Sequence, residues 1–184
     1  MTTDKSSSVV LQTGFPSNDN LTARSVLPNQ AAAVAFSPKP DVSAMGESWW
    51  DRLFHYNHVH LDNVQLAVRG TKAQLSICSS THDTLWQNIP DSLNCVATTT
   101  AVADIEDDEE PFNVLEWHPT DVVVLRKRQL YWLVVEPVDG EVLEWVFAQP
   151  GVNQWGSAYQ TKDTWQLDSE DGPVPCAIVA VVAH

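Results

Sequence analysis

Residues 129–148 read QLYWLVVEPVDGEVLEWVFA, and this stretch decides the fold class. Two runs rich in β-branched and aromatic residues, 129–137 and 141–148, flank the pair Asp139-Gly140. Such runs favour β-strands, and an Asp-Gly pair between two of them is the strongest short signal for a two-residue hairpin turn. The stretch therefore predicts an antiparallel β-hairpin.

The same pattern recurs earlier in the chain. Apolar and polar residues alternate over 64–69, Gly70-Thr71 follows, and a second alternating run covers 73–77. A period of two is typical of a strand with one buried face. This region therefore predicts a second hairpin, with its turn at Gly70-Thr71.

The remaining elements are predicted to be mostly strands. The continuous apolar run 177–183 suits a central strand packed on both faces. Two short helices are expected, at 48–56 and 81–88. Further strands are predicted at 95–105 and 121–125. Six to eight strands with so little helix predict an all-β chain folded as an antiparallel β-sandwich.

The chain changes in character at Gly46. Residues 1–46 contain no Trp, Cys, His or Tyr and have no net charge, whereas residues 47–184 carry the whole net charge of −14. The sequence therefore predicts an extended polar N-terminal arm, 1–46, followed by a β-sandwich domain, 47–184. Because a segment of this composition cannot bury enough apolar surface alone, we expect Phe15 and Phe36 to anchor the arm on neighbouring chains.

The charge of the chain restricts its partners. There are 24 acidic residues against 10 basic ones, and six of the acids lie within residues 104–110. Such a field repels nucleic acid, anionic membranes and acidic substrates. The basic cluster at 126–128 is too small to reverse it, and the neutral arm is not expected to bind nucleic acid strongly. Proteins, cations and uncharged ligands remain as direct partners.

The three cysteines and the hydropathy pattern predict a chain made inside the cell. Cys78, Cys95 and Cys176 are odd in number and widely spaced, which indicates neither a disulfide framework nor a zinc module. We expect them to be buried small residues in a reducing compartment. The run 177–183 is far shorter than the ~20 residues of a membrane span, so no membrane association is expected.

One cluster has the residue types of a metal site. In an extended segment, His58, His60 and Asp62 would project from one face, and imidazole with carboxylate suits a divalent transition metal. A polar stripe at a sheet edge or subunit interface explains the same residues equally well. The sequence has no glycine-rich phosphate loop, no Gly-x-Ser-x-Gly and no His-Glu-x-x-His. The expectation is a chain that is not an enzyme and carries no cofactor.

The order of arm, short aromatic helix and strands resembles the jelly-roll capsid proteins of small icosahedral RNA viruses. The phrase Gly46-Glu47-Ser48-Trp49-Trp50-Asp51-Arg52-Leu53 looks like the segment before the first strand in picorna-like capsid subunits. Many plant-virus capsid arms are strongly basic, whereas this arm has no net charge. The resemblance is therefore to the picorna-like and tymovirus-like shells.

The resemblance implies a jelly-roll-like sandwich that acts as a structural subunit of a virion, made in the host cytoplasm. Its partners would be other shell subunits, in a homo- or hetero-oligomer that the arm tethers. Interface contacts are then expected from Phe15, Phe36, Trp49, Trp50 and Phe54. The alternatives are a cytoplasmic acidic module that binds proteins or mimics nucleic acid as an inhibitor, and a cupin-like metal enzyme using His58, His60 and Asp62.

Overall fold

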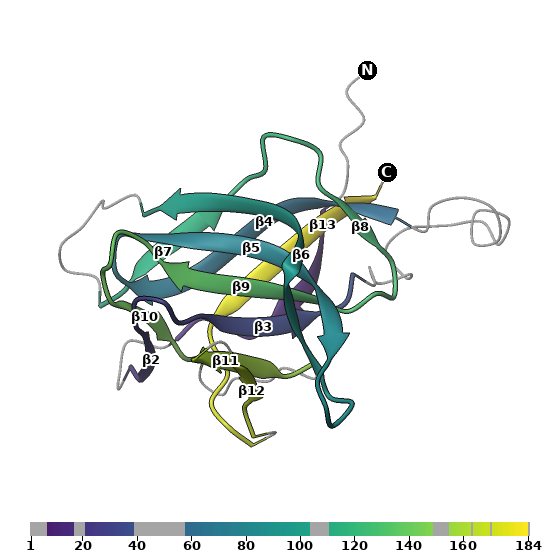
Figure 1. Cartoon of the computed structure of the whole chain (residues 1–184). Helices are drawn as coiled ribbons and strands as arrows, with labels where there is room; N and C mark the ends of the chain where they lie inside the picture. The colour runs from purple at the N-terminus through teal and green to yellow at the C-terminus, as the bar shows by residue number, and fades with distance from the viewer. Residues whose placement is uncertain are drawn as a thin grey trace, which may run out of the picture.

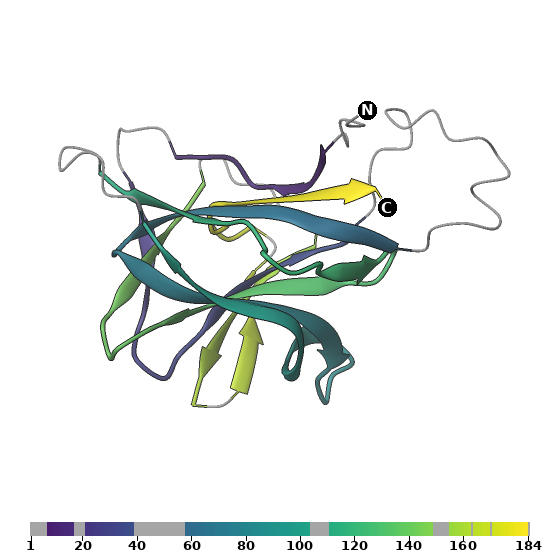
Figure 2. The same ribbon diagram turned by 90° about the horizontal axis from the view of Figure 1, so that it is seen from above.

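The protein is an antiparallel β-sandwich, which confirms the predicted fold class. The computed structural model describes residues 7–16, 21–38, 58–103, 111–148, 155–162, 164–169 and 171–183. These residues form thirteen strands and no helix. The strands make two sheets that pack face to face, and Figure 2 shows them as two layers.

The first sheet has seven strands. Its main path is β1-β13-β4-β10-β2, while β7 and β8 both pair with β4. The bounds are β1 Ser7–Gln12, β2 Ala23–Val26, β4 His58–Arg69, β7 Asn113–Trp117, β8 Val124–Arg126, β10 Leu143–Val146 and β13 Ala177–Ala183. The apolar run 177–183 is thus an internal strand between β1 and β4, as predicted.

The second sheet has six strands in the order β12-β11-β3-β9-β5-β6. The bounds are β3 Ala32–Phe36, β5 Lys72–His82, β6 Asn88–Val102, β9 Tyr131–Pro137, β11 Ser157–Thr161 and β12 Thr164–Leu167. Figure 1 shows β5, β9 and β3 crossing in front of β13. Every neighbouring pair in this sheet is antiparallel.

The connections between strands are jelly-roll-like. Four neighbouring strands of the first sheet have the order β1-β13-β4-β7, and four of the second have the order β3-β9-β5-β6. With this order, the chain passes from one sheet to the other between most successive strands. Of the successive connections, β5–β6 and β11–β12 are hairpins within one sheet. Sheet-to-sheet crossing of this kind is typical of jelly rolls.

Alternating side chains of both sheets meet in one apolar core. Leu66 of β4, Leu75 of β5 and Leu133 of β9 are fully buried there. Trp145 of β10 is also fully buried, and its Nε1 donates a hydrogen bond of 2.8 Å to the Cys176 carbonyl oxygen. The indole therefore adds apolar area to the core without leaving an unsatisfied donor.

The two predicted hairpin turns exist, but the predicted strand pairings are wrong. Asp139 and Gly140 have φ values of 57° and 74°, as a type I′ turn requires. However, β9 pairs with β3 and β5, while β10 pairs with β2 and β4. The turn at Gly70 likewise joins β4 of one sheet to β5 of the other. In both cases the local turn only reverses the chain, because burial against opposite sheets decides the partners.

A contact between these two turns fixes them side by side. The Lys72 ammonium at the start of β5 donates a hydrogen bond to an Asp139 carboxylate oxygen. That hydrogen bond, together with the negative charge of Asp139, raises the pKa of Lys72. Gly70 has a φ of 144°, and this position must lack a side chain, because a Cβ there would lie 2.8 Å from Leu143 Cδ1.

The N-terminal segment differs from the expected arm. β1 pairs with β13, β2 pairs with β10, and β3 lies between β9 and β11. Residues 31–36 are all buried, so this short apolar run is part of the core although the surrounding sequence is polar. The boundary at residue 46 and the helix predicted at 48–56 lie outside the described residues. Within the described part of the chain, no helix is long and apolar enough to cross a membrane.

Candidate protein-interaction surface

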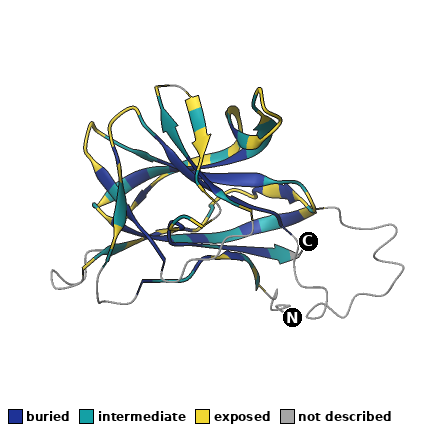
Figure 3. Ribbon diagram, turned by 90° about the horizontal axis from the view of Figure 1, so that it is seen from below, coloured by how far each residue is buried: buried dark blue, intermediate teal, exposed yellow. Residues whose placement is uncertain are grey.

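The β5–β6 hairpin is the longest strand pair among the described residues and forms one end of the six-stranded sheet. Its register runs from Lys72 opposite Val102 to His82 opposite Asn88. The end of the hairpin extends beyond the rest of the sheet (Figure 1) and is mostly exposed or half-buried (Figure 3). It therefore presents its loop residues to solvent on several sides.

The hairpin closes with a turn at residues 83–87, and the helix predicted at 81–88 is wrong. The Asp83 amide donates to the Gln87 carbonyl oxygen at 3.0 Å. Asp83 Oδ1 accepts hydrogen bonds from the amides of Leu85 and Gln87, both at 2.8 Å. An aspartate that binds nearby backbone amides competes with helix formation, and Thr81 and His82 are already paired with β6.

This turn displays two large apolar side chains. Leu85 is 74% exposed and Trp86 is 83% exposed. Trp86 has a φ of 62°, a left-handed conformation that costs roughly 1–2 kcal/mol for a residue with a side chain. Its ring lies 5.8 Å from the His82 ring. Such backbone strain is often found at functional positions, so this turn is a candidate site.

A second turn lies on β6, where four residues, 91–94, bulge out of the pairing between Ser80↔Pro90 and Cys78↔Cys95. The Leu93 amide donates to Asp91 Oδ1 at 3.2 Å, and Asn94 Nδ2 donates to Asp91 Oδ2 at 2.6 Å. Leu93 itself is 95% exposed. We call Leu85, Trp86 and Leu93 the hairpin patch, since all three are apolar, exposed and held on turns that an aspartate orders.

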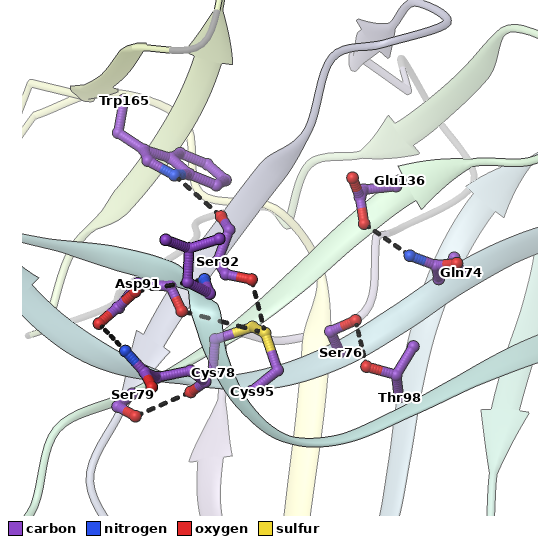
Figure 4. Close-up of a disulfide and its surroundings, with 12 residues drawn as sticks. Gln74, Ser76, Cys78, Ser79, Asp91, Ser92, Cys95, Thr98, Glu136 and Trp165 are labelled. Atoms are coloured by element: carbon purple, nitrogen blue, oxygen red, sulfur yellow. Dashed lines mark hydrogen bonds between the residues drawn. A yellow bond between two sulfur atoms is a disulfide. The ribbon is translucent and has the colours of Figure 1, made fainter.

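A disulfide between Cys78 and Cys95 anchors the second turn to β5 (Figure 4). Ser79 Oγ adds a 2.8 Å hydrogen bond to the Asn94 carbonyl oxygen, and Trp165 Nε1 donates to Ser92 Oγ at 3.3 Å. The expectation of three reduced, buried cysteines is therefore wrong for this pair. The two residues face each other across adjacent strands only because the register includes the bulge, which their spacing in the sequence does not reveal.

Cys176 is the free cysteine, and it is fully buried. Burial raises the pKa of its thiol to about 11. We therefore expect no reaction with a thiol reagent in the native protein at pH 8, where about one thiol in a thousand would be ionised. Unfolding without a reductant should expose one reactive thiol, and unfolding after reduction should expose three. Three thiols without a reductant would contradict the disulfide.

A shallow groove of about 220 Å³ lies beside the disulfide, on the outer face of β9, β5 and β6. Gln74 Nε2 donates to Glu136 Oε2 at 2.8 Å, and the hydroxyls of Ser76 and Thr98 are 2.9 Å apart. Leu93 also lines the groove, so one residue of the hairpin patch borders it. Its lining contains no histidine beside a serine, and it offers hydrogen-bonding and apolar contacts to a ligand or a protein segment.

The residues predicted as a metal site lie on β4. His58, His60 and Asp62 alternate with buried residues and share the outer face of the strand. His58 lies opposite Arg126, and Asp62 accepts a 2.7 Å hydrogen bond from Ser7 Oγ. Alternate residues of a strand are roughly 6.6 Å apart, and among the described residues no group of three His, Cys, Asp or Glu side chains is placed to hold a metal ion.

The structure describes two of the five predicted interface residues, Phe36 and Phe15. Phe36 is fully buried and stacks on Tyr131 with ring centroids 6.0 Å apart, so it belongs to the core of its own chain. Phe15 is half-buried and lies 6.4 Å from the Phe112 ring. Trp49, Trp50 and Phe54 lie outside the described residues, as does the acidic run at 104–110. The hairpin patch was not predicted, although the pairs Asp83-Thr84 and Asp91-Ser92 are turn signals.

The chain matches no model of a known protein family and no curated protein sequence.

Proposed function

We propose that the chain is a structural subunit of a multi-chain protein assembly, and specifically of a virus shell. The observation that supports this proposal is the hairpin patch. Three large apolar side chains on ordered turns are exposed far more than their chemistry favours in an isolated chain. Exposed apolar patches of this kind mark protein interaction sites, and tryptophan is enriched among the residues that dominate binding energy.

The energetics favour a protein partner. Burying a large apolar side chain contributes on the order of 1.5–3 kcal/mol, so burial of the three residues against a partner would favour the contact. Because Asp83 and Asp91 already order the two turns, less conformational entropy is lost on binding. A docking element that is ordered before it binds suits a subunit that must join many identical neighbours.

Two further features support an assembly. The edge strand β6 has a proline, an aspartate and a bulge near its start, but from residue 95 to residue 102 it contains no charged residue and no proline. This part of the edge is therefore open to pairing with another chain. The jelly-roll-like strand order agrees with the resemblance to shell proteins, and disulfides such as Cys78–Cys95 persist at virion surfaces.

The proposal predicts the oligomeric state. The full chain is expected to form oligomers by sedimentation velocity and light scattering, and a Trp86→Ala/Leu93→Ala variant is expected to shift to monomers. Val142, which is 52% exposed outside the patch, provides the matched control Val142→Ala, which should assemble normally. A wild-type chain that stays monomeric at its highest soluble concentration would refute the proposal and would favour a monomeric acidic binding module.

A further inference from the structure

We infer that the hairpin patch of one copy docks on the outer face of β8 in a second copy of this chain. This inference rests on the proposed function and names the two surfaces that meet. The receiving surface, which we call the basic face, consists of Val122, Val124 and Arg126 along β8 and the residues just before it, together with Arg128 in the turn that follows. Both surfaces are built from described residues whose side chains are exposed.

The basic face contains positive charges that form no ion pair with any described residue of this chain. Arg24, Arg69 and Lys72 each form an ion pair with an acid of the same chain. By contrast, Arg126 and Arg128 have exposed side chains, and neither makes an ion pair with a described residue. In a chain of net charge −14, such a surface attracts the acidic surface of another copy.

Apolar side chains lie beside these charges. Val122 is 71% exposed and Val124 is 46% exposed, while the intervening Val123 and Leu125 are buried. The alternation continues to Arg126, so the valines and this arginine project from the same side of the strand. β8 pairs with β4, and no other described strand pairs with β8. The basic face is therefore the outer surface of an edge strand, and it carries apolar and positive side chains.

The hairpin patch has the complementary chemistry. The Asp83 carboxylate accepts a hydrogen bond from the Leu85 amide, and the Asp91 carboxylate accepts one from the Leu93 amide. Each turn therefore carries one carboxylate next to an exposed apolar side chain. When the two surfaces meet, Leu85, Trp86 and Leu93 would cover the valines while the carboxylates approach the arginines. Charge complementarity of this type fixes the register of a contact and suppresses wrong partners.

The two surfaces belong to different sheets and lie apart in both views of the molecule (Figures 1 and 2). The contact therefore joins unlike surfaces of two copies, so each subunit keeps one hairpin patch and one basic face to offer. A head-to-tail contact of this kind forms closed rings when its rotation closes and filaments when it does not. It is thus suited to building large assemblies from one chain.

A mixing experiment with two full-length variants tests the inference. The hairpin variant carries Trp86→Ala and Leu93→Asp, and the β8 variant carries Val122→Asp and Arg126→Glu. Each variant alone is expected to sediment as a monomer, because each lacks one of the two surfaces. An equimolar mixture is expected to form a dimer that grows no further, because one intact hairpin patch meets one intact basic face.

Controls separate docking from folding. All four substituted side chains are exposed, and thermal unfolding should show that both variants remain folded. Arg126→Lys should assemble like the wild type, and Arg126→Glu/Arg128→Glu should weaken association by at least about tenfold, or 1.4 kcal/mol. If the β8 variant and the Arg126→Glu/Arg128→Glu variant both assemble as well as an assembling wild type, the inference fails while the proposed function survives. A monomeric wild type would instead refute the proposed function.

Discussion

Replacing Asp168 with alanine is expected to lower the free energy of unfolding by about 2 to 3 kcal/mol. Asp168 follows β12 and forms a two-point ion pair with Arg24 of β2, at 2.8 Å from Nη1 to Oδ2 and 2.7 Å from Nη2 to Oδ1. The pair thereby links the six-stranded sheet to the seven-stranded sheet. Removing one partner of a buried pair leaves an uncompensated charge, which typically costs 3–5 kcal/mol.

Burial decides the size of this effect. The side chain of Asp168 is 9% exposed and that of Arg24 is 24% exposed, so water screens the pair only in part. Ser157 Oγ also donates to Asp168 Oδ2 at 2.7 Å, and the Arg24 guanidinium lies 4.7 Å from the centre of the Tyr159 ring. The alanine variant therefore loses three hydrogen bonds, two from Arg24 and one from Ser157, and leaves the Arg24 guanidinium without a carboxylate partner beside the Tyr159 ring.

The Arg69–Glu144 pair provides the matched control. Its two side chains are 44% and 38% exposed, with 3.1 Å between Nη1 and Oε2. Because exposed ion pairs contribute about 0–1 kcal/mol, Glu144→Ala should change the free energy of unfolding by less than about 1 kcal/mol. Urea unfolding followed by tryptophan fluorescence measures both variants. Equal losses in the two variants would show that the Arg24–Asp168 pair does not hold the sheets together.

The sequence predicts which segments are strands better than it predicts their partners. The run 177–183 is a strand with the predicted bounds and the predicted internal position. The Asp139-Gly140 and Gly70-Thr71 turns also form, yet their flanking strands pair elsewhere. A turn signal concerns four residues, whereas pairing depends on which face of each strand can be buried against segments far away in the chain.

The hairpin patch could not be predicted for a related reason. Leu85 and Trp86 lie within 81–88, which the sequence predicts to be a short helix, and Leu93 lies just before the predicted strand at 95–105. Their exposure depends on two aspartate-ordered turns and on the four-residue bulge opposite Ser79. The bulge exists only in the register that places Cys78 opposite Cys95, and no local pattern encodes that register.

The same register makes the disulfide the second site with a large expected effect. Replacing both cysteines, Cys78→Ala/Cys95→Ala, is expected to lower the free energy of unfolding by about 3 kcal/mol, since the bond closes a loop with a sequence separation of 17 and loops of this size gain about that much. Alanine suits these positions because Cys78 is 1% exposed, where a serine hydroxyl would need a new partner.

Reduction of the wild type should reproduce the loss. Urea unfolding with and without a reductant should differ by about 3 kcal/mol for the wild type and should not differ for the double alanine variant. Cys176 is a buried free thiol and is retained in both proteins, so it does not contribute to the comparison. A reductant effect of equal size in the double variant would contradict the role given to the Cys78–Cys95 bond.

Association should weaken along with stability. The disulfide anchors the turn at residues 91–94, so its loss leaves Leu93 supported by the Asp91 hydrogen bonds, by Ser79 and by the contact between Trp165 and Ser92. A turn that must be ordered on binding has a lower affinity. Sedimentation velocity of the oxidised and reduced wild type at a temperature where both are folded measures this effect. Undiminished association of the reduced chain would show that the Leu93 turn is not part of the contact between subunits.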